Sequence, residues 1–204
     1  MSDFPPVRRA DKEMPQEAAR ELLANGFCGR LGTCGADGWP YVVPLLYVVL
    51  EGEIWMHNTR AAGHLRANIE RDPRACFELD EPGAIFPYGR FECDTSIAYR
   101  SLVAFGRVRI VAEPSAKQAF FEAFMSKYAD PAWPQRAPGF FPRLDAVTVY
   151  AFAIERMSGK STPLPPLQQR WPALDRTKSP QAQTPSAAAE RSATPDTTAP
   201  RRRE

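Results

Sequence analysis

Residues 27–58, FCGRLGTCGADGWPYVVPLLYVVLEGEIWMHN, contain three apolar runs separated by two short turns that each contain glycine. The Asp37-Gly38 pair suits the positive φ angles of a hairpin turn, and Glu51-Gly52 marks a second turn. The pattern predicts strands at residues 27–34, 39–50 and 53–58. Strands joined by turns this short must be antiparallel neighbours, so an antiparallel sheet is expected.

The chain on either side of this stretch adds helices and further strands. Proline at position 15 is typical of a first helical turn and Asn25-Gly26 of a left-handed stop, which predicts a short helix at residues 16–24. Two more helices are expected at residues 63–71 and 115–128, the second capped by Ser115. Further strands are expected at residues 74–80, 96–112 and 146–156, and loops rich in proline at residues 81–91 and 130–143.

The last of these strands indicates how the sheet is arranged. In residues 146–156 both alternating sets of side chains contain apolar residues. Burial on both faces is what the wall of a barrel requires. Six or so antiparallel strands and three helices therefore predict a mostly β fold, a small antiparallel barrel with helices packed outside it.

Composition and charge exclude several classes of protein. The chain has 204 residues, and 44% of them are hydrophobic, which excludes disorder over the full length. Residues 1–158 contain 18 Lys and Arg against 20 Asp and Glu, whereas residues 159–204 contain 8 against 4. The folded part has no basic surplus from which to build a nucleic-acid-binding patch. We therefore expect no nucleic-acid partner.

Compartment and metal content are also constrained. No apolar run approaches the ~20 residues needed to cross a bilayer, and the N-terminus lacks the apolar stretch of a secretory signal. We expect a cytoplasmic protein with no membrane partner. The four cysteines form no C-x-x-C pair, and only two histidines are present, so no metal is expected. Reduced thiols are favoured over disulfides in such a chain.

Composition divides the chain into four segments. Residues 1–14 are expected to form an N-terminal arm, and residues 15–160 the folded domain. Residues 161–174 are rich in proline and predict an extended strap along the domain surface. Residues 175–204 contain no aromatic residue and no apolar type except alanine, so they are expected to form a disordered tail.

An ordered series of short motifs runs through the folded domain: Glu21-Leu22-Leu23-x-x-Gly26-x-x-Gly29-x-Leu31-Gly32-Thr33, Asp37-Gly38-x-Pro40-Tyr41-x-Val43-Pro44-Leu45-x-Tyr47, Ile54-x-x-His57, Gly63-His64, Asn68-Ile69-x-x-Asp72-Pro73-Arg74, Tyr99-Arg100-Ser101-Leu102-Val103-x-Phe105-Gly106-Arg107 and Ile154-Glu155-Arg156-Met157-Ser158-Gly159-Lys160. Each motif is weak alone, but their order is specific. In this order the chain resembles the pyridoxamine 5′-phosphate oxidase-related, FMN-binding split-barrel family, nearest the branch that contains the nitroimidazole-resistance proteins. The resemblance covers roughly residues 10–160.

The resemblance implies a six-stranded split barrel that forms a homodimer, with two FMN molecules in clefts at the subunit interface. It places cofactor contacts in three segments: Pro44, Leu45 and Tyr47; His57, Asn58, Thr59, Arg60, Gly63, His64 and Arg66; and Tyr99, Arg100 and Ser101. The flavin phosphate is expected near residues 58–66. That location has independent support, because Gly63 permits close backbone approach and the start of the helix favours an anion.

One position departs from the family pattern. Many relatives carry lysine directly after the Gly-His pair, where it can reach the phosphate, whereas this chain has Leu65. Arg66 and Arg60 are the nearby cations that could replace that lysine, since a guanidinium can bind phosphate in a bidentate manner. The departure also leaves another flavin, or a deazaflavin, open as the cofactor.

Several of these residues have a structural interpretation beside the functional one. From the residues alone, His57 and His64 would be surface or capping histidines. The resemblance implies instead that His64 contacts the phosphate or cleft and that His57 contacts the flavin edge. A role as haem ligand is a further alternative for either histidine. Ordinary strand packing also explains Pro44, Leu45 and Tyr47. Arg100 would usually be a solvated or paired surface group. In the 86–95 loop, Cys93 lies between two acidic residues that weaken a thiolate, so it is not interpreted as a nucleophile.

Two functions follow from the resemblance. The first is a flavin-dependent oxidoreductase that passes electrons from a reduced nicotinamide to a small organic acceptor, such as a nitroaromatic. The cofactor would carry the redox chemistry, which fits the lack of an acid–base constellation in the sequence. The second is a non-catalytic carrier or sensor of the same fold that holds flavin or haem. Oxidation of pyridoxamine phosphate itself is disfavoured, because the additional C-terminal Arg/His substrate motif was not found.

Overall fold

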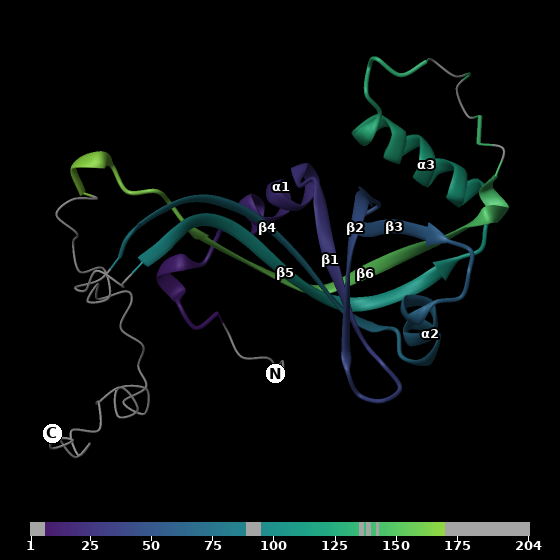
Figure 1. Cartoon of the computed structure of the whole chain (residues 1–204), viewed down its shortest axis with the longest axis horizontal. Coiled ribbons are helices and arrows are strands. Elements are labelled where there is room, and N and C mark those ends of the chain that lie inside the picture. The colour runs from purple at the N-terminus through teal and green to yellow at the C-terminus, as the bar shows by residue number, and fades with distance from the viewer. Residues whose placement is uncertain (1–6, 89–94, 135–136, 138–139, 142, 170–204) are drawn as a thin grey trace, which may run out of the picture. The chain divides into compact units, whose positions relative to one another are not determined.

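Six antiparallel strands form a closed ring in the order β1-β2-β3-β6-β5-β4 (Figure 1). The computed structural model describes residues 7–88, 95–134, 137, 140–141 and 143–169. The strands are β1 (Cys28–Cys34), β2 (Pro40–Leu50), β3 (Glu53–Thr59), β4 (Arg74–Pro87), β5 (Thr95–Val111) and β6 (Val147–Thr162). The mostly β, six-stranded antiparallel split barrel expected from the sequence is confirmed.

The first three strands pair as their short turns predict. Strand β2 pairs along its first half with β1, as Arg30 opposite Pro44 illustrates. Its pairing with β3 involves Tyr47–Leu50. Glu51 and Gly52 both have positive φ, 52° and 81°, as a two-residue hairpin turn requires, whereas at the first turn the positive φ is that of Gly38. The prolines of β2 therefore lie before the segment that pairs with β3, so neither removes an N–H donor from the β2–β3 ladder.

Two strands are longer than predicted. Residues 81–87 were expected to belong to a loop, but they continue β4, and β6 extends to Thr162 instead of ending at residue 156. Both extensions lie in strands that flank β5 in the ring, and backbone pairing with β5 does not require a regular side-chain pattern. The prediction from composition was therefore wrong for these two segments, because pairing with other strands keeps them extended. Residues 89–91 of the expected loop lie outside the described residues.

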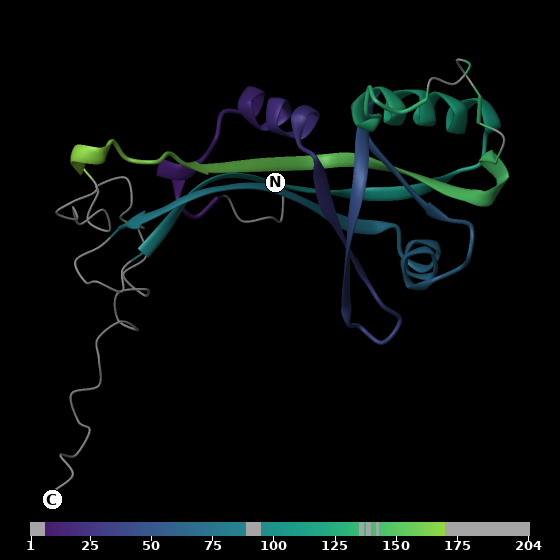
Figure 2. The same cartoon turned by 45° about the horizontal axis from the view of Figure 1, so that its top comes forward.

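Within the part of the chain that the structure describes, three α-helices accompany the strands, close to the predicted ranges (Figures 1 and 2). They are α1 (Gln16–Asn25), α2 (His64–Arg71) and α3 (Pro114–Tyr128), with short 3₁₀ turns η1 (Ala10–Lys12), η2 (Leu144–Ala146) and η3 (Leu167–Gln169). Helix α1 packs on β6 and β2, α2 on β1 and β2, and α3 on β2. The residues that end α1 and begin α3 do not act in the way that the sequence predicts.

Gly26 does not adopt a left-handed conformation after α1. Its φ and ψ are −60° and 144°, which any residue can adopt. A Cβ at this position would lie 2.7 Å from the hydroxyl of Tyr47 and would also collide with Leu79. Close packing, not backbone freedom, is what requires glycine here. Similarly, Ser115 is not the cap of α3, because the helix begins at Pro114 with Glu113 as N-cap and no side-chain cap bond.

Strand β6 is buried on both faces, as its two apolar sets predicted. Tyr150 and Phe152 face the barrel interior and belong to a core that also contains Leu31, Met56 and Phe77. Val149 and Ala151 face the other way, into a second core with Phe120 of α3. Helix α3 therefore covers the outer surface of the barrel wall.

The chain divides into two compact units: Glu13–Ile85 with Ile97–Leu164, which includes most of the barrel, and Met1–Lys12 with Phe86–Ser96 and Pro165–Glu204. In the described part of the second unit, Arg9 donates hydrogen bonds to Asp11 (2.6 Å) and to the hydroxyl of Tyr88 (3.0 Å). Residues 170–204, which include the predicted tail, lie outside the described residues, as does Cys93. The described cysteines Cys28, Cys34 and Cys76 are free thiols. Within the described residues, none of the helices combines the length and apolarity needed to cross a bilayer.

Candidate functional site

A pocket of about 350 Å³ lies where β3, β5 and β6 meet helices α2 and α3. Its floor is apolar, and its polar groups are three cations, one carboxylate and one hydroxyl. The lining residues are Arg60, Arg66, Ile110, Val111, Ala112, Lys117, Asp145, Val147 and Thr148. Arg60 and Arg66, both predicted site residues, are therefore brought together. We call this cavity the cationic pocket.

Its three cations come from three different segments, the residue after β3, helix α2 and helix α3, and they differ in their partners. Arg66 on α2 forms an ion pair with Glu70 one turn later, with Nε 2.8 Å from Oε1. Lys117 on α3 donates to the carbonyl oxygens of Leu144 (3.4 Å) and Val147 (3.2 Å). The guanidinium of Arg60 has no ion pair or hydrogen bond to any residue in the described part of the chain. Arg60 is thus the cation whose side chain is already available to a ligand.

Backbone pairing sets the position of Arg60. Strands β3 and β6 pair up to Thr59 and Val147, and the N–H of Arg60 then donates to the carbonyl of Ala146 at 3.1 Å. This hydrogen bond extends the β3–β6 pairing by one residue. It places Arg60 beside η2, which contains Asp145. Residues 60 and 145, far apart in sequence, therefore line the same cavity.

The packing of helix α2 explains why this chain has leucine at position 65. Leu65 is only 4% exposed and packs in the barrel core with Ile69, and Asn68 is buried on the same helical face. Arg66, the next residue, lines the cationic pocket. In this chain, position 65 supplies core packing and position 66 supplies the positive charge.

Four other predicted residues lie near the start of α2 without lining the cationic pocket. The Asn58 side chain accepts a hydrogen bond from the Tyr150 hydroxyl at 3.1 Å, and Thr59 is the last paired residue of β3. Gly63 is the N-cap of α2, and a Cβ there would meet open space. The exposed His64 packs its ring against Tyr41, with centroids 5.5 Å apart.

His57 lies elsewhere, beneath α3. Its ring packs against Phe120, Phe121 and Phe124, with centroid distances of 5.0–5.5 Å. Burial lowers the pKa of His57 below its ordinary value, and its Nδ1 is buried without a hydrogen-bond partner in the described residues. These surroundings stabilise a neutral imidazole and keep it away from the three cations.

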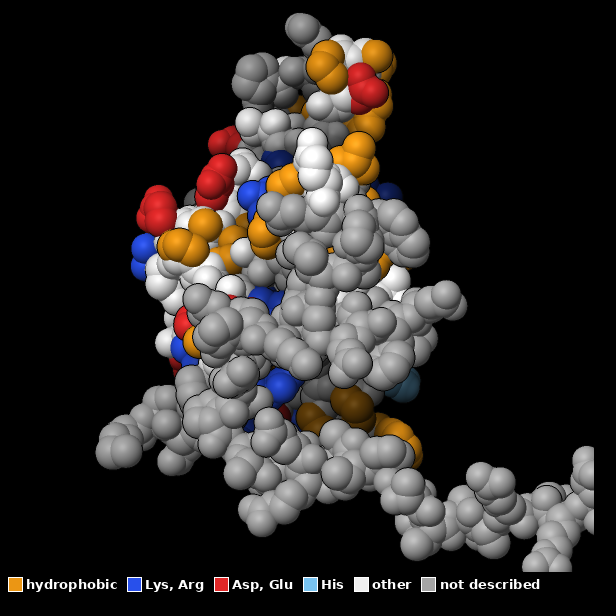
Figure 3. Space-filling model, turned by 90° about the vertical axis from the view of Figure 1, so that its left-hand side faces the viewer, with side chains coloured by type: hydrophobic (Ala, Val, Ile, Leu, Met, Phe, Trp, Pro, Cys, Tyr) orange, Lys and Arg blue, Asp and Glu red, His pale blue; other side chains and the backbone are white. Residues whose placement is uncertain are grey.

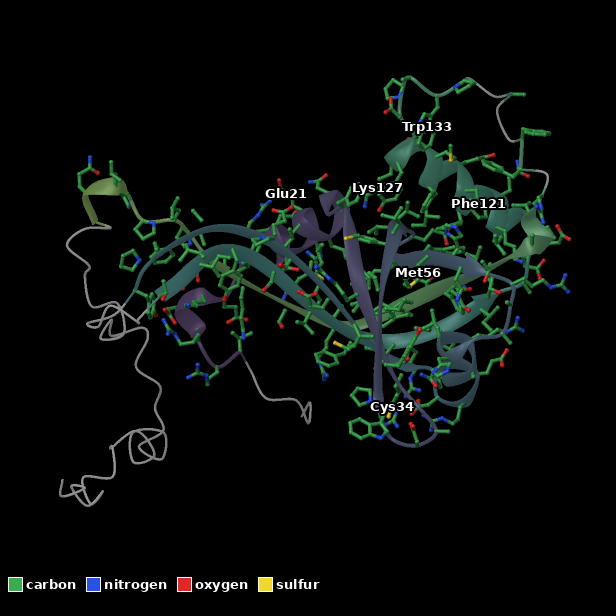
Figure 4. The ribbon with its side chains drawn as sticks, viewed as in Figure 1. Glu21, Cys34, Met56, Phe121, Lys127 and Trp133 are labelled. Carbon is green, nitrogen blue, oxygen red and sulfur yellow. The ribbon has the colours of Figure 1, made fainter. Side chains whose placement is uncertain are left out.

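Tyr47 is covered by the end of α3 and by the core. Its hydroxyl donates to the carbonyl of Leu23 at 2.5 Å, and its own carbonyl accepts from the Lys127 ammonium at 3.2 Å. Lys127 also lies 4.0 Å from the centre of the Tyr47 ring, and burial lowers the pKa of Lys127 to about 8. Figure 4 labels Lys127 and Phe121 on α3. The Tyr47 side chain is thus committed to packing, while Pro44 is exposed and Leu45 half-buried on the same strand.

The third predicted segment is distant from the cationic pocket. Tyr99 and Arg100 line a different cavity, and Ser101 pairs with Lys160. Arg100 and Val111 are eleven residues apart along β5, which is about 35 Å in an extended strand. A ligand that fits the cationic pocket is therefore too short to contact Tyr99, Arg100 or Ser101 of the same chain.

Of the lining residues only the two arginines were predicted, and the polar residues that were missed are Lys117, Asp145 and Thr148. Lys117 lies on a helix for which the sequence pattern identified only the apolar face, and Asp145 lies in η2, between the proline-rich loop and the last strand that the sequence predicts. No local signal distinguishes either residue from an ordinary surface charge. Only the approach of α3 and η2 to the end of the β3–β6 ladder brings them to the arginines.

The arrangement is suited to an anion. Three positive groups against one carboxylate leave a positive excess, and two of the three are guanidiniums that can bind a phosphate in a bidentate manner. The apolar floor of Ile110, Val111 and Val147 lowers the local polarity and strengthens charge interactions with a bound group. The geometry therefore fits a phosphate carried by a partly apolar molecule.

Comparison with known proteins agrees with this fold. A family model described as pyridoxamine 5′-phosphate oxidase matches residues 15–161. The chain therefore belongs to the pyridoxamine 5′-phosphate oxidase family. No curated protein matches the chain in sequence.

Solved structures of low sequence identity share the fold. The flavocytochrome Anf3 from Azotobacter vinelandii has a TM-score of 0.68 at 20% identity, over 83% of this chain and 79% of that chain. The FAD and haem binding protein from Mycobacterium smegmatis has a TM-score of 0.63 at 22% identity, over 74% and 73%. A candidate 5-nitroimidazole antibiotic resistance protein from Bacteroides thetaiotaomicron has a TM-score of 0.59 at 17% identity, over 72% and 85%. At these identities the likeness establishes the fold alone.

Proposed function

We propose that the protein is a flavin-binding oxidoreductase that holds FMN by its phosphate in the cationic pocket. The observation that carries the proposal is the convergence of Arg60, Arg66 and Lys117 from three segments of the chain on one cavity. Support also comes from the family match and from structural relatives that are described as flavocytochrome or FAD-binding proteins. The bound flavin would supply the redox chemistry, taking electrons from a reduced nicotinamide for a small organic acceptor.

The protein's own residues have the tasks of binding and orientation. Arg60, without a partner in the described residues, would bind the phosphate first. Arg66 would exchange part of its ion pair with Glu70 for the phosphate, and Lys117 would add charge from α3 while remaining bonded to two carbonyls. The N-terminus of α2 next to Arg66 favours the same charge. A single terminal phosphate suits this cluster, which is why we propose FMN rather than another flavin or deazaflavin.

We further propose that the functional unit is a homodimer. The segment at Tyr99, Arg100 and Ser101 lies too far along β5 to contact a flavin held in the cationic pocket of its own chain. If both segments contact one flavin, they must come from two chains. A second copy of the chain is therefore part of the proposed site.

A non-catalytic carrier or sensor is the second candidate. The residues lining the cationic pocket include a single carboxylate, Asp145, and no histidine, so they present no acid–base pair. Such a pocket would suit retention of a flavin as well as catalysis with it. Haem binding would need an accessible imidazole, which the exposed His64 offers and the packed His57 does not.

The test begins with the purified full-length protein and its absorbance spectrum. We expect a yellow protein whose flavin is bleached by NADH or NADPH under anaerobic conditions and recovers when a nitroaromatic is added. Mass spectrometry of the released ligand should identify FMN. A bound flavin that no nicotinamide reduces would favour the carrier, as would a protein that binds haem in place of flavin, and a protein that takes up neither would overturn both candidates.

A further inference from the structure

A second cavity, of about 470 Å³, lies near the other end of the β5–β6 ladder. It is lined by consecutive residues of β4, β5 and β6 and by the segment that follows β6: Glu81, Pro82, Gly83, Ala98, Tyr99, Arg100, Ser161, Thr162, Pro163 and Leu164. None of these residues lines the cationic pocket. We call this cavity the ladder pocket.

The charged groups of the ladder pocket are Arg100 and Glu81, which form an ion pair that uses only one carboxylate oxygen. Arg100 donates from both Nε (3.0 Å) and Nη2 (2.5 Å) to the same oxygen, Oε2 of Glu81. Within the described part of the chain, neither Oε1 of Glu81 nor Nη1 of Arg100 has a hydrogen-bond partner. The pair therefore presents an unused acceptor and an unused donor, with no net charge. Both side chains remain reachable, since Arg100 is 47% exposed and Glu81 is 41% exposed.

The remaining walls are apolar or uncharged. Pro82, Ala98, Pro163 and Leu164 provide apolar surface, and Ser161 lies opposite Arg100 in the ladder. Thr162, another lining residue, is only 8% exposed, and its hydroxyl is buried without a hydrogen-bond partner in the described residues. Buried polar groups are nearly always paired in folded proteins, so this wall retains unused hydrogen-bonding capacity.

We propose that the ladder pocket binds a small planar carboxamide carried on an apolar ring. A primary amide has an acceptor and a donor side by side, which complements the unused donor of Arg100 and acceptor of Glu81. A carboxylate would bind Arg100 but be repelled by Glu81. An ammonium would bind Glu81 but be repelled by Arg100. The proposal does not rest on the flavin chemistry, because it is argued from the ion pair and walls of this cavity within one chain, although Tyr99 and Arg100 also belong to the segment that the proposed dimer would bring to a flavin.

Three probes with the same ring separate these chemistries: benzamide, benzoate and benzylamine. Each is titrated into the full-length protein, and its dissociation constant is measured by ligand-observed NMR. We expect benzamide to bind at least about tenfold more tightly than either charged probe. Equal affinities for the three probes, or no binding of benzamide at millimolar concentration, would overturn the proposal.

Variants of the ion pair then identify the site. Glu81→Gln should weaken benzamide about tenfold and strengthen benzoate, whereas Arg100→Gln should weaken benzamide and strengthen benzylamine. The matched control is Arg107→Gln, which breaks an exposed Arg–Glu pair of the same strand β5, formed with β6 outside the pocket (Arg107 Nε to Glu155 Oε1, 3.0 Å). Benzamide affinity that is unchanged in both pocket variants, or equally reduced in the control, would show that it binds elsewhere. Flavin content, measured in parallel for Glu81→Gln, reports on the proposed function separately, because Glu81 has no part in the proposed flavin site.

Discussion

At the residue scale, two cations of the cationic pocket differ in what they must give up to bind phosphate. Arg66 is already paired with Glu70, while the Arg60 side chain has no partner among the described residues. The sequence alone favoured Arg66, because it lies next to the position where relatives carry lysine. The structure makes Arg60 an equal candidate, since its binding to phosphate breaks no existing ion pair.

Arg60→Ala and Arg66→Ala should each weaken FMN binding by about tenfold to hundredfold, because each removes a charge-assisted hydrogen bond. Riboflavin, which lacks the phosphate, should be affected much less. Fluorescence titration of the flavin-free protein with both ligands measures the difference. Arg74→Ala, which removes an exposed cation paired with Asp72 outside the pocket, is the control. Equal losses for FMN and riboflavin would place the phosphate elsewhere.

His57 makes the stability of the protein depend on pH. Burial lowers its pKa in the folded state, so the unfolded chain binds the extra proton more readily below the ordinary imidazole value of about 6.5. Stability should therefore fall as pH drops from about 6.5 through the folded-state pKa. His57→Phe, which matches the surrounding phenylalanines, should flatten this slope. Urea unfolding at several pH values between about 5 and 7.5 measures it, and an identical slope in the variant would rule out His57 as its cause.

At the element scale, the β5–β6 pair is joined by a register shift between Phe105 and Gly106. A Cβ on Gly106 would overlap the carbonyl oxygen of Ala153 on the facing strand. The shift thus depends on two backbones that approach too closely for any side chain. It lies between the cationic pocket and the ladder pocket, which occupy opposite ends of this ladder.

Gly106→Ala should destabilise the barrel by about 3 kcal/mol, since the strands must separate to admit the methyl group. Gly32→Ala on β1 is the matched control, because a Cβ there would lie 3.5 Å from the nearest atom, an ordinary contact. Its cost should stay within about 1 kcal/mol. Chemical denaturation of both variants compares the free energies of unfolding, and equal values would show that the strand pair can relax at Gly106.

At the scale of the whole molecule, large apolar side chains remain exposed on the unit that contains most of the barrel. Val42 is 61% exposed on the outside of β2, and Phe105 is 37% exposed on β5. Figure 3 shows apolar side chains beside charged ones on one face of the chain. Exposed apolar surface of this kind often marks an interface, and a second copy is the partner we propose.

Light scattering should therefore give twice the mass of one chain at micromolar concentration. The same dimer would supply the Tyr99–Ser101 segment that one chain cannot bring to its own cationic pocket. A monomer at these concentrations would contradict both the dimer and the two-chain flavin site.

Residues 175–204 lie outside the described residues, and their composition carries a prediction of its own. Deleting them should leave folding and flavin content unchanged, because they contain no apolar side chain larger than alanine. Thermal unfolding of the truncated chain tests this. A fall in melting temperature of several degrees would show that the tail contributes to the folded structure.

Most of the fold could be predicted because its signals are local. The turn at Glu51-Gly52 and the two apolar sets of β6 depend on neighbouring residues, and both predictions were confirmed. Where a local signal was absent, the prediction was wrong, as for residues 81–87, which only pairing in the barrel holds extended. The role of Gly26 was also misjudged, since it depends on the hydroxyl of Tyr47, which is distant in sequence.

The amino-acid sequence by itself determined the strands, the helices, the family and the two arginines after β3, since each follows from residue order along one segment. Only the tertiary structure decided that Lys117 and Asp145 join those arginines, and that Tyr47 and His57 are enclosed by α3. The physical reason is that a pocket is made by segments that meet in space. Which residues meet depends on where the β3–β6 ladder ends and how α3 packs, and neither is encoded by any one stretch of the chain.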